Sequence, residues 1–192
     1  EEVVKYLKIG AESGSLSMKH EYGIRLLSTD NGTALKLIEE AGENKYQPSV
    51  EWLMGYYGTF PHYSKNDYGK WMEIGAGMNI EVPLKDYIPY LIENNVEKAR
   101  NYLLDNYNEK NIECLNWIYK YNNALEIDKS WLLSEMKSHY RKSRQLRDYY
   151  AEFLLKNDFL HEYGEFCKET SSINPDEERY YLLLKEVFEA TT

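Results

Sequence analysis

Two His-Glu pairs, His20–Glu21 and His161–Glu162, begin like the zinc-protease motif, in which a second histidine follows the glutamate after two residues. Ile24 and Glu165 occupy the place of that second histidine. The chain has four histidines, and they are scattered without a spacing suited to a metal ion. The sequence therefore predicts neither a catalytic residue set of this type nor a metal site.

A glycine pair, Gly75 and Gly77 around Ala76, could suggest a phosphate-binding loop. The dinucleotide motif needs a third glycine where Ile80 stands, and it follows a β-strand that this sequence does not predict. Cys114 and Cys167 are far apart, and neither has a histidine that the sequence places beside it, so both are expected to be buried thiols. We expect no cofactor and no enzymatic activity, because no nucleophile and base can be paired.

Basic side chains are concentrated in the segment KSHYRKSRQLR. Lys137, Arg141 and Arg144 are spaced at i, i+4 and i+7, which predicts one stripe on a helix. Either the stripe is a solvated face paired with acidic neighbours such as Glu135 and Asp148, or it docks an acidic partner or an anionic glycan.

Aromatic residues crowd the stretch between Trp52 and Tyr63, which also includes Tyr56, Tyr57 and Phe60. Adjacent residues of a helix cannot both face the core, so at least one of Tyr56 and Tyr57 is expected at the surface. Core filling is the favoured interpretation for Trp52. For Tyr57 and Tyr63, core packing and partner binding are both open.

The composition excludes several classes of protein. The 192 residues carry a net charge of -9, which argues against a nucleic-acid binder. No run of about 18 apolar residues is present, so no membrane-inserted helix is expected. The 19 tyrosines suit contact surfaces, although an AT-rich genome would also raise their number.

Hydrophobic residues recur with the helical period of 3.6, which predicts an all-α chain. Pro83 and Pro89 mark a boundary or kink, and we divide the chain there into 1–82 and 83–192. The last helix should begin with Asn174 as N-cap and Pro175 in its first turn. Beyond the prolines, the expected helices span about 90–106, 110–125, 129–156, 158–170 and 175–189.

Three segments of the first region align with one another: KYLKIGAESG from Lys5, KLIEEAGENK from Lys36 and KWMEIGAGMN from Lys70. Each has a bulky residue in the second column and a pair of small residues four positions later. The bulky residues are Tyr6, Leu37 and Trp71, and the small pairs are Gly10–Ala11, Ala41–Gly42 and Gly75–Ala76. A second pattern, with Tyr22–Gly23 and Met54–Gly55, alternates with the first at an offset of 32 residues. Two interleaved patterns of one period predict a repeating pair of antiparallel helices whose small residues permit close packing.

These columns resemble the Sel-1-like repeat, a relative of the tetratricopeptide repeat. The matching residues of the first helices are Tyr22, Gly23, Leu26 and Gly55, and those of the second helices are Ala34, Leu37, Ala41, Gly42, Trp71, Gly75 and Ala76. Gly14 stands where the family closes its second helix. The resemblance covers residues 1–82 and implies an α-solenoid of helix pairs, with residues 83–192 as a helical extension or degenerate repeats. The first segment would be a second helix, so the chain is expected to begin part-way through a repeat.

The resemblance also implies a function. Proteins of this family are non-enzymatic adaptors that bind a protein or peptide on a concave surface lined by first helices. Candidate partner-binding residues are Tyr22, Tyr56, Tyr57, Tyr63, Lys137, Arg141 and Arg144. Bacterial members assemble envelope, secretion or virulence machinery, which favours the cell envelope or periplasm over the cytoplasm. The alternative is an acidic inhibitor or immunity protein that blocks a basic toxin or enzyme by charge complementarity. The sequence leaves the oligomeric state open.

Overall fold

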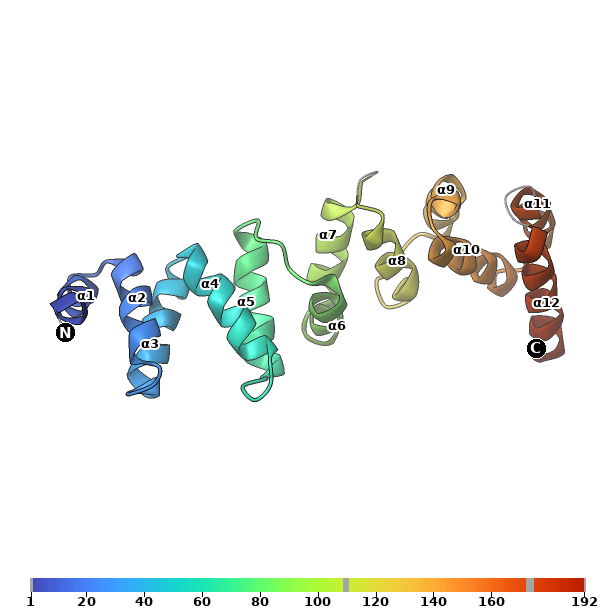
Figure 1. Ribbon diagram of the computed structural model, residues 1–192. Coiled ribbons are helices and arrows are strands. Elements are labelled where there is room, and N and C mark those ends of the chain that lie inside the picture. Colours follow the sequence, from blue (N-terminus) through green and yellow to red (C-terminus); the bar gives the residue numbers. More distant parts are fainter. Residues whose placement is uncertain (1, 109–110, 172–174, 192) are drawn as a thin grey trace. The chain divides into compact units, whose positions relative to one another are not determined.

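The computed structural model describes residues 2–108, 111–171 and 175–191, and the regular elements within them are all helices (Figure 1). They are α1 (Glu2–Glu12), α2 (Leu16–Leu26), α3 (Asn31–Glu43), α4 (Gln47–Gly58), α5 (Lys65–Gly77), α6 (Leu84–Asn94), α7 (Val96–Asn106), α8 (Glu113–Lys120), α9 (Lys129–His139), the 3-10 turn η1 (Tyr140–Lys142), α10 (Arg144–Lys156), α11 (Leu160–Ser171) and α12 (Pro175–Thr191). The prediction of an all-α chain is confirmed.

The helices form two compact units, Glu1–Asn94 and Asn95–Thr192. Within the first unit, each helix from α1 to α6 packs against the next one along the chain. Within the second unit, α7 packs against α8, α9 against α10, α10 against α11 and α11 against α12, and α8 and α12 both also contact α10. This sequential packing is the solenoid-like arrangement that the sequence predicts. Pro83 directly precedes α6, so the boundary chosen from the sequence falls one helix before the division between the units.

Glycines bring the helices of the first unit close together. At Gly42, on α3, an added Cβ would lie 2.7 Å from Cζ3 of Trp71 and 3.0 Å from Cδ1 of Leu53. Such a Cβ would also meet side chains within 3.4 Å at Gly10, Gly23, Gly69 and Gly75. Gly55 belongs to the same sequence pattern, yet a Cβ there would have no neighbour within 4 Å. The predicted close approach therefore occurs at most positions of the pattern, but not at Gly55.

Trp71 completes the hydrophobic core of this unit. It is 1% exposed and packs with Ile38, Val50 and Leu53, which lie on α3 and α4. Tyr6 occupies the same sequence column on α1 but is 63% exposed. One repeat column thus contains both a core residue and a surface residue.

His20 links α2 to α4 and should make this unit sensitive to acid. The Nδ1 atom of His20 lies 3.0 Å from Oγ of Ser49, and Ser49 is fully buried. Desolvation of the imidazole ring lowers the pKa of His20, although the nearby charge of Glu21 acts to raise it. Because the unfolded chain then binds more protons, the free energy of unfolding should fall as the pH drops below about 6.5, and level off below the folded pKa. Urea titrations between pH 7.5 and 5 should show this slope, and His20→Gln should flatten it. An unchanged slope in His20→Gln would contradict the assignment.

The second unit has a two-helix period that the sequence comparison does not reveal. Its odd-numbered helices start at residues 96, 129 and 160, which are 33 and 31 residues apart, and its even-numbered helices start at 113, 144 and 175, which are 31 residues apart. Residues at these spacings are buried in equivalent places: Tyr119, Tyr150 and Tyr181 on the even-numbered helices, and Leu103, Met136 and Cys167 on the odd-numbered ones. The helix pairs therefore continue beyond residue 82, although their sequence columns do not.

Tyrosine–carboxylate hydrogen bonds connect neighbouring helix pairs of this unit, and we call them clasps. Tyr119 donates to Glu152 at 2.8 Å, and Tyr107 donates to Glu135 at 2.6 Å. The other two clasps join Tyr140 to Glu169 and Tyr181 to Asp148. Each clasp spans 28 to 33 residues, which is about one helix pair.

Two predicted helices are divided in the structure, and a third, expected over 110–125, is reduced to α8. The helix expected over 90–106 is divided at Asn95, whose Oδ1 accepts from the backbone N–H of Lys98 and so begins α7. The helix expected over 129–156 is divided into α9, which ends at His139, and α10, which starts after Ser143. The Oγ of Ser143 accepts a hydrogen bond from the backbone N–H of Leu146. Asparagine and serine side chains compete for backbone N–H groups in this way and favour a new helix start. Pro89 lies inside α6, and the predicted N-cap Asn174 lies outside the described residues.

Candidate functional site

The aromatic cluster predicted near Trp52 forms at the end of α4 and in the loop that follows. The ring of Tyr56 stacks on Trp52 with centroids 4.9 Å apart and on His62 with centroids 4.2 Å apart. Phe60 is 93% exposed and Tyr63 is 59% exposed. We call Tyr56, Phe60, His62 and Tyr63 the aromatic surface.

The other two predicted tyrosines lie partly inside the first unit. Tyr57 packs against the core and donates a 2.7 Å hydrogen bond to Glu39 of α3. Burial and this hydrogen bond raise the pKa of Tyr57 far above its usual value, so the phenol stays neutral. Tyr22 is half-buried on α2. Tyr57 thus packs largely against the core, whereas the side chain of Tyr63 is exposed at the surface.

The basic stripe predicted for one helix is divided among three elements, because the chain breaks at η1. Lys137 lies on α9, Arg141 on η1 and Arg144 at the start of α10, and all three are exposed. Arg141 forms an ion pair of 2.8 Å with Glu169 of α11. The guanidinium of Arg144 lies 6.0 Å from the ring centre of Tyr180. The prediction that these three residues form a stripe on a single helix is therefore wrong.

The carboxylates expected to neutralise this stripe have other partners. Glu135 and Asp148 accept hydrogen bonds from Tyr107 and Tyr181 in two of the clasps. Glu169, which the sequence does not single out, accepts from both Tyr140 and Arg141 and has its pKa lowered by these hydrogen bonds.

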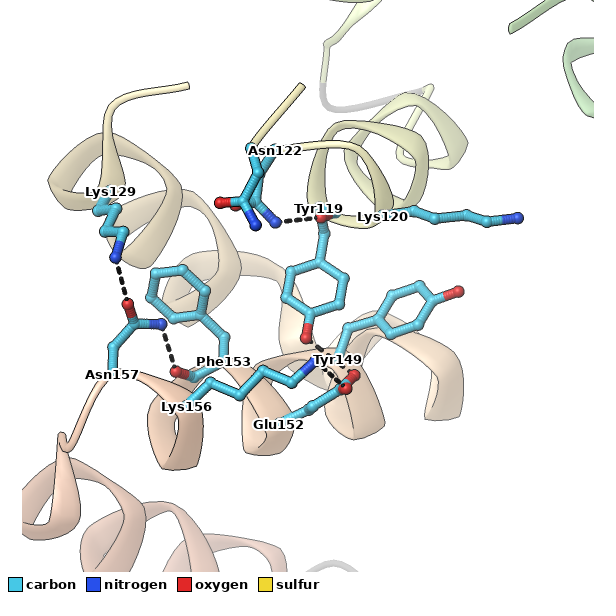
Figure 2. Close-up of a pocket in the computed structure, with 10 residues that line it drawn as sticks. Tyr119, Lys120, Asn122, Lys129, Tyr149, Glu152, Phe153, Lys156 and Asn157 are labelled. Atoms are coloured by element: carbon cyan, nitrogen blue, oxygen red, sulfur yellow. Dashed lines mark hydrogen bonds and ion pairs between the residues drawn. The ribbon is translucent and has the colours of Figure 1, made fainter. Parts of the chain in front are cut away.

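A polar groove lies between α8, the start of α9 and α10, and encloses a cavity of about 510 Å³ (Figure 2). We define this lysine–asparagine groove by six of its lining residues: Lys120, Asn122, Asn123, Lys129, Lys156 and Asn157. In Figure 2, Lys129 and Lys120 lie on opposite sides of Tyr119, Lys156 and Glu152, and the side chain of Lys120 extends away from these three residues. The repeat spacing of the second unit creates the groove, since it brings α8 beside α10.

The lysines of the groove outnumber the carboxylates that line it. Glu152, the one acidic residue among the described residues that line the groove, pairs with Lys156 and accepts from Tyr119. Burial alone would raise the pKa of Glu152, but the hydrogen bonds from Lys156 and Tyr119 outweigh it and hold that pKa below its usual value. Lys129 donates to a neutral acceptor, the Asn157 side-chain oxygen, at 2.9 Å. Lys120 lies over the ring of Trp117 at 4.9 Å and over that of Tyr121 at 5.5 Å.

Comparison of the chain with protein-family models, curated proteins and solved structures found no match. Within the described residues, no helix has the length and hydropathy needed to cross a bilayer. The same residues contain no group of three histidine, cysteine or acidic side chains placed to hold a metal ion.

Both cysteines are buried, as predicted, and burial raises the pKa of Cys114 to about 11. The lysine–asparagine groove was not predicted from the sequence because its residues come from three separate elements. The 31-residue spacing of Tyr119 and Tyr150 was the available signal, because it predicts that α8 and α10 are equivalent helices of adjacent pairs.

Proposed function

We propose that this chain is a non-enzymatic protein-interaction module built from Sel-1-like helix pairs, which binds a partner protein or peptide through the aromatic surface. The observation that carries the proposal is the exposure of Phe60 and Tyr63 beside the stacked rings of Trp52, Tyr56 and His62. Large exposed aromatic side chains are enriched at protein interfaces, where each can contribute about 2 kcal/mol or more. The helix pairs and their close glycine contacts support the repeat assignment.

The double variant Phe60→Ala/Tyr63→Ala tests this proposal. Both side chains are exposed, so the fold should be retained, as circular dichroism can verify. We expect a partner captured from the native source and identified by mass spectrometry to bind the double variant at least about tenfold more weakly than the unaltered chain, a loss of about 1.4 kcal/mol. Tyr6→Ala/Ile9→Ala is the matched control, because it removes two exposed apolar side chains from the same unit.

Equal binding by Phe60→Ala/Tyr63→Ala and the unaltered chain would overturn the aromatic surface as the binding site. The net charge of -9 favours the alternative of an inhibitor that covers a basic protein. In that case binding would be one-to-one and would weaken strongly between about 50 and about 500 mM salt, whatever residues stand at 60 and 63.

A further inference from the structure

The lysine–asparagine groove is a local region of positive charge in an acidic protein. Three lysines and one glutamate line it, whereas the whole chain carries a net charge of -9. Lys156 is paired with Glu152, which leaves the charges of Lys120 and Lys129 without a carboxylate among the described residues that line the groove.

Three carboxylates at or beside the groove accept hydrogen bonds from groups other than Lys120 and Lys129. Glu152 accepts from Tyr119 as well as from Lys156, and Asp128 accepts from the hydroxyl of Ser130 and the backbone N–H of Trp131 at the start of α9. Glu113 lines a smaller cavity of about 130 Å³ that shares Lys120 and Tyr149 with the groove, and it accepts from the indole of Trp117. The two ammonium groups therefore offer charge-assisted hydrogen bonds to an anionic ligand from outside the chain.

Side-chain amides supply the remaining polar groups. Asn157 donates to the carbonyl of Phe153 and accepts from Lys129, which orients its amide at the groove wall. Asn122 donates to the carbonyl of Tyr119, which leaves the other N–H and the side-chain oxygen for a ligand. Amides of this kind can pair with both the N–H and the C=O of an extended peptide backbone.

An apolar pocket continues from the groove on the other side of α10. Tyr149, Glu152 and Lys156 line both spaces, and the second one, of about 310 Å³, is completed mainly by apolar residues of α10 and α12. These are Leu155, Tyr180, Leu184, Val187 and Phe188. A segment that leaves the groove over Lys156 would reach this pocket with an apolar side chain.

We propose that the lysine–asparagine groove binds an extended acidic segment of a partner protein, with carboxylates at Lys120 and Lys129 and a bulky apolar residue in the pocket between α10 and α12. This site lies in the second unit and is independent of the aromatic surface. Charge complementarity identifies the partner chemistry, because the groove offers two ammonium groups without a carboxylate among its described lining residues, in a chain whose net charge is -9.

Fluorescence anisotropy with a synthetic peptide tests the proposal. The probe is a fluorescein-labelled dodecapeptide of alternating glutamate and alanine that ends in two phenylalanines, and its matched control replaces every glutamate by glutamine. In about 50 mM salt we expect saturable binding of the acidic probe and at least about tenfold weaker binding of the glutamine probe. Lys120→Gln/Lys129→Gln should weaken binding of the acidic probe by a similar factor.

Two control variants separate the site from a general charge effect. Lys5→Gln/Lys85→Gln makes the same change in net charge on exposed lysines of the first unit, and binding should remain within about twofold. Val187→Ser should weaken the acidic probe several-fold, yet leave a version without the phenylalanines unchanged.

Three results would overturn the proposal. They are no saturable binding of the acidic probe below about 1 mM, an equal loss in Lys5→Gln/Lys85→Gln, and tighter binding of a thymidine dodecamer than of the peptide. The last result would assign the groove to a nucleic acid. Because the first unit is unchanged in the groove variants, none of these outcomes depends on Phe60 or Tyr63.

Discussion

Replacing Trp71 by alanine is expected to lower the free energy of unfolding by about 4 kcal/mol. The indole is 1% exposed, and its ring atoms touch Gly42 and the cluster of Ile38, Val50 and Leu53, so the deletion leaves a large cavity in the first unit. Urea unfolding followed by circular dichroism measures the loss.

Trp52→Ala is the matched control for this prediction. Trp52 is half-buried and stacks on Tyr56 at the edge of the core, so its removal should cost about 1.5 kcal/mol. A cost for Trp71→Ala no greater than that for Trp52→Ala would contradict the place of Trp71 at the centre of this unit.

The same substitution, glycine to alanine, should have opposite effects at Gly42 and Gly55. At Gly42 the new methyl would lie 2.7 Å from Trp71 and 3.0 Å from Leu53, and we expect a net loss of about 1–2 kcal/mol despite the better helix propensity of alanine. At Gly55 a Cβ meets nothing within 4 Å, so the propensity gain of about 0.5–1 kcal/mol should appear as added stability.

A double-mutant cycle sharpens this prediction. In the Trp71→Ala background the nearest neighbour of the new methyl is gone and only Cδ1 of Leu53, at 3.0 Å, still crowds it, so Gly42→Ala should destabilise the chain less than it does in the unaltered chain. Additive effects of Gly42→Ala and Trp71→Ala would show that the glycine is not required by this contact.

Small residues made the first unit predictable from its sequence. Where a large side chain of another helix packs against a helix backbone, a small residue must stand at the contact, and Gly10, Gly42 and Gly75 lie against side chains in this way. The second unit uses no such constraint. On its odd-numbered helices the equivalent core positions hold Leu103, Met136 and Cys167, which differ in volume because their neighbours differ too, whereas Tyr119, Tyr150 and Tyr181 keep the register on the even-numbered helices.

The candidate sites were predictable only in part. A crowded aromatic stretch was visible, but the separation of half-buried Tyr57 from exposed Tyr63 depends on Glu39, which lies 18 residues upstream of Tyr57. The prediction of the basic stripe was wrong because Ser143 starts a new helix. Its hydroxyl accepts a hydrogen bond from the backbone N–H of Leu146, and the spacing of the basic residues does not reveal this local hydrogen bond. Predicting the groove would have required knowing that α8 packs against α10, which is a tertiary contact.

The clasps have a consequence for how the second unit is made. Each joins residues 28 to 33 apart, so the contact becomes available as soon as one further helix pair has left the ribosome. A contact that closes a loop of about one helix pair costs less loop entropy than a contact between distant parts of the chain. The helix pairs can therefore be added one after another during synthesis, with each tyrosine fastening the newest pair to the one before it.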